Sequence, residues 1–184
     1  MRSVPADILI VDDLEEKHLA YRASLEELGQ NIVTATSGAE ALRLLLERDF
    51  AVILLDVNMP DISGHETAAL IRKRKKSRHT PIIFITAFAD DVQAAEGYAL
   101  GAVDYILTPI VPEILRAKVK VFVDLYQMRG ELARSHALLE KRVEERTAEL
   151  ERTAETLKVE VGERKRAEER LSMLVSELTH RVKN

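Results

Sequence analysis

The sequence predicts an α/β fold with a five-stranded, doubly wound parallel sheet, followed by a long coiled-coil helix. Short apolar runs alternate with amphipathic segments over residues 1–125, as they do in repeated strand–helix units. The run at 51–55 is too short for a helix and shows no polar alternation, which is typical of a strand buried on both faces. From residue 126 the chain is rich in Glu, Arg, Lys, Leu and Ala and has no proline, which favours one long helix.

Composition limits the classes of function. With 184 residues, 46% of them apolar, the chain can build one ordinary domain and an appendage. Aromatic residues make up 4% and the net charge is -4, so neither base stacking nor charge attraction predicts a nucleic-acid partner. The chain has no cysteine, which excludes disulfides and thiolate metal sites. Residues 1–5 lead directly into a strand and no apolar run reaches transmembrane length, so we expect a cytoplasmic protein without a membrane partner.

The first two strand–helix units have clear boundary signals. A strand is expected at 8–11, and the helix after it should run over 15–28 because Gly29 is a common stop signal. After a second strand at 31–35, Ser37 and Glu40 have the spacing of a capping box. The apolar positions of the first helix include Leu19, Leu25 and Leu28. The inner face of the second helix is expected to consist of Ala41, Leu42, Leu45 and Leu46.

The later units follow the same alternation. After the third strand, a helix is expected from Gly64 to about Lys76. The fourth strand is expected at 81–86, a helix at 90–100, the fifth strand at 102–107, and a last helix from near Pro112. The basic run Arg72–Arg78 could contact nucleic acid or a membrane, but a solvated helix end, favoured by the helix dipole, is the expected role.

Acidic residues are expected to meet at the C-terminal edge of the sheet. Asp56 ends the third strand, where an unpaired carboxylate is costly, so something positive should lie beside it. In a doubly wound sheet the ends of the first and third strands are neighbours, which would bring Asp12, Asp13 and Asp56 together. Such carboxylates repel one another unless a divalent cation binds them, and oxygen ligands favour Mg²⁺ over Zn²⁺. The ion would also orient a phosphoryl donor, which predicts a phosphoryl-accepting site.

Several spaced motifs carry a family resemblance. They are Asp12-Asp13, Asp56 followed by Asn58-Met59-Pro60 and Gly64, Thr86-Ala87 after the fourth strand, and Tyr105 on the fifth. With them, residues 6–125 resemble the flavodoxin-like receiver domain of bacterial response regulators. The resemblance implies that Asp12 and Asp56 bind Mg²⁺ directly, Asp13 through a water, and Asn58 through its backbone carbonyl. It also implies that Asp56 becomes an acyl phosphate, that the Thr86 hydroxyl moves to the phosphate, and that Tyr105 changes rotamer with it.

One position departs from the family pattern. The family places a lysine before the proline that follows the fifth strand, and this chain has Thr108-Pro109 there. A threonine hydroxyl can donate one hydrogen bond but carries no charge. The sequence offers no obvious substitute, although Lys17 lies in the segment after the acidic pair. We therefore expect Asp56 to be phosphorylated slowly, not at all, or with a different output, and Thr108→Lys to label faster with acetyl phosphate.

Heptad spacing after the domain predicts a parallel two-helix coiled coil over residues 126–172. Positions seven apart are Val143, Leu150, Leu157, Arg164, Leu171 and Leu178, and their companions are Thr147, Ala154, Val161, Glu168 and Val175. Arg164 and Glu168 form a polar gap in this seam. A single charged helix packed on the domain is the alternative, but a helix this long cannot bury its leucine stripe alone. No strong breaker precedes the segment, so one continuous signalling helix is expected.

Residues 173–184 resemble the start of a histidine kinase dimerisation helix. His180-Arg181-Val182-Lys183-Asn184 is similar to the H-box of the HWE and HisKA_2 kinase families, in which the phosphoacceptor histidine precedes Arg-Val-Lys-Asn. With Leu178 at heptad position d, His180 falls at the outward position f. An ordinary surface histidine is the alternative. The resemblance implies a receiver–histidine kinase truncated before its ATP-binding domain.

Two functions from different classes follow from these features. In the first, the receiver regulates a histidine kinase through a homodimeric coiled coil, and phosphate passes between Asp56, His180 and partner signalling proteins. In the second, the chain is a dimerisation and partner-binding module with weak or no phosphorylation. In both, the chain alone is expected not to hydrolyse ATP, because nothing in residues 1–184 predicts an ATP site.

Overall fold

The structure is a computed structural model that describes residues 4–87 and 104–183, with side chains to residue 176. Five strands form one parallel sheet in the order β2-β1-β3-β4-β5, as predicted. They are β1 (Asp7–Val11), β2 (Asn31–Ala35), β3 (Val52–Asp56), β4 (Ile82–Thr86) and β5 (Asp104–Leu107). The helices are α1 (Glu15–Leu25), the 3₁₀ helix η1 (Glu26–Leu28), α2 (Gly38–Glu47), α3 (Gly64–Lys73) and α5 (Pro112–Lys183). The helix predicted at 90–100 lies outside the described residues.

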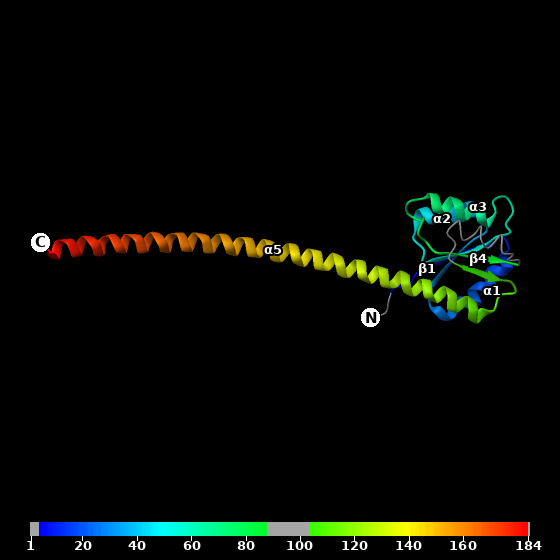
Figure 1. Cartoon of the computed structure of the whole chain (residues 1–184). Helices are drawn as coiled ribbons and strands as arrows, with labels where there is room; N and C mark the ends of the chain where they lie inside the picture. Colours follow the sequence, from blue (N-terminus) through cyan, green and yellow to red (C-terminus); the bar gives the residue numbers. More distant parts are fainter. Residues whose placement is uncertain (1–3, 88–103, 184) are drawn as a thin grey trace. The chain divides into compact units, whose positions relative to one another are not determined.

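The chain divides into two compact units, Met1–Glu131 and Leu132–Asn184. The first holds the sheet, and Figure 1 shows α1 and the first turns of α5 on one side of it, with α2 and α3 on the other. The second holds the remainder of α5, so the continuous helix expected from the sequence is confirmed. In the part of the chain that the structure describes, no helix has an apolar stretch that could cross a bilayer.

Alternate strand residues pack into two separate cores in the first unit. Ile10 and Leu54 face Leu25 of α1 and Leu115 of α5. The intervening strand residues pack against α2 and α3 on the other face, in a cluster that includes Leu9, Leu55, Phe84, Leu45 and Ile71. Because every residue of β3 and β4 is buried, these strands carry unbroken apolar runs rather than a polar alternation. The polar side chains of these two strands, Asp56 and Thr86, therefore lie at the strand ends.

Leu46 of α2, predicted to face inward, points to solvent instead, and so does Leu19, an apolar position of α1. The buried face of α1 is set by His18, Tyr21 and Leu25, and Leu19 is 73% exposed because it lies about 100° around the helix from His18. Leu46 of α2 follows the buried Leu45 and is exposed for the same reason. The prediction that Leu46 belongs to the inner face of its helix was therefore wrong.

Side-chain caps fix the ends of α2 and α3. Ser37 accepts a hydrogen bond from the Glu40 amide as predicted, but the Glu40 carboxylate accepts from the Thr36 amide instead of returning to Ser37. A complete capping box occurs at α3, between Ser63 and Glu66.

Two arginines of the basic run Arg72–Arg78, which begins in the last turn of α3, donate hydrogen bonds to backbone carbonyls. Arg72 donates to the carbonyls of Arg78 and Thr80, and Arg74 donates to the carbonyl of Leu42. Helix α3 ends at Lys73, short of the predicted Lys76, and the Arg74 side chain reaches across to the middle of α2. These arginine contacts support a structural role for the run.

Gly64 allows α3 to begin directly against the end of β3. A Cβ at Gly64 would lie 2.2 Å from the Asp56 carbonyl oxygen and 2.9 Å from the Val57 Cα, and neither backbone atom can rotate away. Gly64→Ala is therefore expected to lower the free energy of unfolding by about 2 kcal/mol, measured by urea denaturation. Gly162→Ala is the control, because its Cβ would meet no atom within 4 Å. A Gly64→Ala variant as stable as wild type would contradict this close approach.

Candidate functional site

The C-terminal ends of β1 and β3 bring three carboxylates together. The parallel pairing of these strands places Val11 beside Leu55, so Asp12 lies next to Asp56. One oxygen from each of Asp12, Asp13 and Asp56 lies within 4.8 Å of the others. Asp12 and Asp56 are buried, and Asp13 is partly exposed. The acidic cluster expected from the strand order is therefore present at this edge of the sheet.

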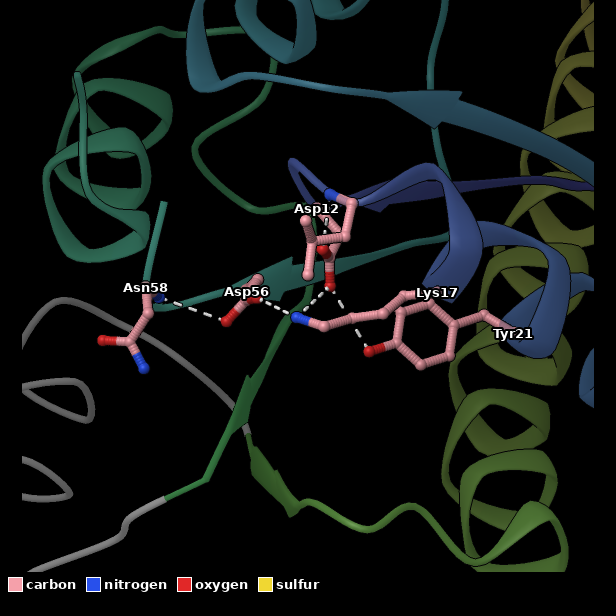
Figure 2. A network of polar contacts seen from close by, with 6 residues as sticks. Asp12, Lys17, Tyr21, Asp56 and Asn58 are labelled. Carbon is pink, nitrogen blue, oxygen red and sulfur yellow. Dashed lines mark hydrogen bonds and ion pairs between the residues drawn. The ribbon is translucent and has the colours of Figure 1, made fainter. Parts of the chain in front are cut away.

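Lys17 places an ammonium group between two of these carboxylates, as Figure 2 shows. Its Nζ lies 2.7 Å from Oδ2 of Asp56 and 3.0 Å from Oδ2 of Asp12. Lys17 belongs to the first turn of α1, which begins two residues after Asp13. The positive group expected beside Asp56 is thus a residue of the chain itself.

Backbone amides bind the Oδ1 atoms of Asp12 and Asp56, and a tyrosine hydroxyl adds a contact to Oδ2 of Asp12. Oδ1 of Asp12 accepts from the Leu14 amide at 3.0 Å, and Oδ1 of Asp56 accepts from the Asn58 amide at 3.1 Å. The Tyr21 hydroxyl donates to Oδ2 of Asp12 at 3.4 Å (Figure 2). Both carboxylates are therefore fixed in orientation by the turns that follow their own strands.

Burial and charge act together on the protonation of these groups. Burial raises the pKa of Asp12, and the charge of Asp56 adds to it, so the hydrogen bonds from Leu14 and Lys17 offset the rise only in part. Burial lowers the pKa of Lys17, but its hydrogen bonds to Asp56 and Asp12 outweigh burial and leave the pKa above its usual value. Burial raises the pKa of Tyr21, again helped by Asp12, so its hydroxyl remains a donor at neutral pH. The amine of Lys17 accordingly stays charged.

The residues of the cluster fit a magnesium ion. Its donors are all oxygens, which Mg²⁺ prefers over the nitrogen and sulfur ligands of Zn²⁺. One ammonium stands against the three acidic residues Asp12, Asp13 and Asp56, so the cluster retains negative charge that a cation can balance.

Three other residues singled out in the sequence lie on or directly after the strands β4 and β5. Thr86 ends β4 and is buried, and the ring of Tyr105 on β5 lies 5.4 Å from that of Phe84. The Thr108 amide donates to the Thr86 carbonyl at 2.9 Å. Among the described residues, no hydrogen bond joins the Thr108 side chain to Asp56. His180 falls in α5 beyond the last described side chain.

Comparisons with known proteins agree with this geometry. A family model described as "Response regulator receiver domain" matches residues 8–120. A probable cyclic di-GMP phosphodiesterase of Vibrio cholerae is 32% identical over 145 residues, which are 79% of this chain and 33% of that protein. This chain therefore spans about a third of that relative's length.

Solved structures match the first unit with similar identity. The Vibrio cholerae chemotaxis protein CheY4 has a TM-score of 0.62 at 31% identity, covering 65% of this chain and 99% of its own. The signal receiver domain of a signal transduction histidine kinase from Syntrophus aciditrophicus has a TM-score of 0.60 at 28% identity, covering 65% and 90% of the two chains.

Proposed function

Since the chain belongs to the response regulator receiver family, we propose that it acts in two-component phosphorelay signalling with Asp56 as its phosphoryl acceptor. The observation that carries this proposal is the cluster of Asp12, Asp13 and Asp56, whose oxygens lie within 4.8 Å of one another. A fold does not need three acidic groups at one strand edge, because their mutual repulsion is unfavourable. A bound cation would offset this repulsion and orient a phosphoryl donor beside Asp56.

In the proposed reaction, an Asp56 oxygen attacks the phosphorus of the donor. The bond from phosphorus to the donor breaks, its electron pair leaves with the donor, and an acyl phosphate forms on Asp56. Asp12, Asp13, Asp56 and the Asn58 carbonyl would hold Mg²⁺, which neutralises and orients the phosphoryl oxygens when bound. The Asn58 amide keeps the other oxygen of Asp56 in place. We assign Thr86 and Tyr105 as the groups that respond to the phosphate.

Labelling with acetyl phosphate tests the assignment of Asp56. In Mg²⁺ the wild-type chain is expected to gain one phosphoryl group by intact mass, whereas Asp56→Asn gains none because it lacks the nucleophile. Chelating the metal should suppress labelling of wild type, since the ion orients the donor. Labelling of Asp56→Asn at the wild-type level would contradict the proposal. A wild-type chain that dimerises but never labels would favour the alternative, a non-catalytic dimerisation and partner-binding module.

We further propose that the second unit pairs with a second copy of itself as a parallel coiled coil. Leu150 and Leu157, seven residues apart, are 69% and 53% exposed in the single chain. Such a stripe is stabilised when an identical helix covers it, because heptad seams are self-complementary. At the polar gap, Arg164 Nε lies 3.0 Å from Glu168 Oε1 in the same helix, so neither charge needs a partner across the dimer.

The output that we propose is regulation of a histidine kinase. Residues 1–125 would form the receiver, 126–172 the signalling coiled coil, and 173–184 the start of the kinase dimerisation helix with His180 as phosphoacceptor. The H-box pattern at His180 supports this assignment. The likeness to a receiver domain of a histidine kinase is consistent with it. ATP would be bound by a separate catalytic domain, so placing phosphate on His180 requires that domain to be added.

A further inference from the structure

We propose that Lys17 of α1 supplies the positive charge that a lysine supplies at the Thr108 position in other receivers, and that it weakens Mg²⁺ binding in doing so. This inference rests on the proposed role of Asp56 as phosphoryl acceptor. Lys17 reaches this site from α1, whereas Thr108 follows β5. Lys17 would serve as the charge partner of the acceptor carboxylate before transfer and of the phosphoryl group afterwards.

The contacts of Lys17 place it at the reacting group. Its Nζ lies 2.7 Å from Oδ2 of Asp56, and the second contact, to Oδ2 of Asp12, fixes the ammonium from the other side. The side chains of Asp56 and Asp12 are 6% and 0% exposed, so water can do little to stabilise their charges. A cation at hydrogen-bonding distance therefore stabilises the charge of the acceptor carboxylate, and Lys17 is in that position.

Among residues 4–87 and 104–131, no second cation forms an ion pair with Asp56. Segment 88–103, which the structure does not describe, contains no lysine, arginine or histidine. Lys118, the nearest lysine in sequence after Thr108, forms an ion pair with Asp104. Within the described ranges, the ion pairs of Asp56 involve Lys17 alone. The loss of the usual lysine is thus matched by an ammonium from α1.

Lys17 acts on the transfer step by charge and not by moving a proton. When acetyl phosphate is the donor, the Asp56 oxygen forms a bond to phosphorus, the bond from phosphorus to the acetate oxygen breaks, and acetate leaves with the electron pair. The phosphoryl group adds negative charge beside Asp56, and the ammonium of Lys17 stays protonated to balance it. Removing Lys17 should therefore slow the transfer.

The same charge has the opposite effect on the metal. Lys17 contacts two carboxylates that would also bind Mg²⁺, so its ammonium repels a divalent ion at close range. Removing Lys17 should therefore tighten Mg²⁺ binding while it slows phosphorylation. A residue that only supports the fold would not produce these opposite signs, because local disorder weakens both properties.

The test measures both properties in the full chain. For Lys17→Met we expect the Mg²⁺ dissociation constant, measured by titration calorimetry, to fall about tenfold and the rate of acetyl phosphate labelling, measured by intact mass, to fall about tenfold. Lys17→Arg, which keeps the charge, should stay within about threefold of wild type in both. Lys120→Met is the matched control, because Lys120 pairs with Asp124 on the surface.

Moving the ammonium back to the family's position completes the test. Thr108→Lys in the Lys17→Met background is expected to restore most of the labelling rate. The Lys17 contact revises the expectation from the sequence that Thr108→Lys alone labels faster: it should change the rate less than about threefold, because Lys17 already supplies the charge. The proposal is overturned if Lys17→Met labels at the wild-type rate, or if it binds Mg²⁺ no more tightly than wild type. A wild type that never labels refutes the proposed function, and the Mg²⁺ titration of Lys17→Met then still decides whether Lys17 opposes the metal.

Discussion

Leu157→Asp is expected to convert a dimeric chain into a monomer. In the proposed coiled coil Leu157 takes a d position, and it is 53% exposed in the single chain. In a parallel dimer the variant would bring two aspartates together in an apolar seam, where desolvation and like-charge repulsion act in the same direction. We expect the dimer dissociation constant to rise on the order of 1,000-fold, the change that about 4 kcal/mol produces. Sedimentation equilibrium measures this constant directly.

Val159→Asp is the matched control for the coiled coil. Val159 lies two residues further on, at the outward f position, and is 54% exposed, nearly the same as Leu157. The same charge introduced there should leave the dimer intact, because f positions face solvent. A wild type that sediments as a monomer, or a dimer that survives Leu157→Asp, would favour a single exposed helix instead.

Asp13→Asn is expected to weaken Mg²⁺ binding by about 30-fold, because one charge of the cluster is removed at close range. Asp13 is the partly exposed member of the cluster, so this change leaves the Lys17 contacts to Asp12 and Asp56 in place. The metal-free chain should unfold at the same or a higher urea concentration, since repulsion among the carboxylates is relieved. Titration calorimetry and urea denaturation measure the two effects.

Asp61→Asn is the control for the metal site. Asp61 lies in the loop after β3 but outside the cluster, and its φ of 66° suits asparagine as well as aspartate. Asp61→Asn should change Mg²⁺ affinity little, although it removes one negative charge from the same region, as Asp13→Asn does. If both variants bound Mg²⁺ alike, general surface charge rather than a defined site would explain binding.

The sheet could be predicted because burial leaves a strong sequence signal. β3 and β4 are buried on both faces and appear as unbroken apolar runs, so their positions followed from length and turn residues alone. The amphipathic helices were harder to orient. Leu19 and Leu46 are apolar yet exposed. The sequence does not distinguish a leucine one position beyond the inward stripe from a core residue, because both are apolar.

The acidic cluster could be predicted from the sequence, but the contact between Lys17 and Asp56 could not. Asp12 and Asp56 end neighbouring strands, so strand order alone brings them together. Lys17 reaches Asp56 from α1, and its direction depends on how the first turn of that helix leaves β1. The sequence did require something positive beside Asp56, and a lysine in the first turn after the acidic pair was the available signal. Helix orientation, which the sequence does not specify, decided that it reaches the site.

A crystal structure of the chain with Mg²⁺ and beryllium trifluoride, a mimic of the phosphoryl group, tests most directly whether Asp56 is a phosphoryl acceptor with Lys17 as its charge partner. We expect one ion held by Asp12, Asp13 and Asp56, the mimic on an Asp56 oxygen, and the Lys17 ammonium in contact with the mimic. An ion bound elsewhere, or a mimic on Asp56 with Lys17 turned away into solvent, would contradict this expectation.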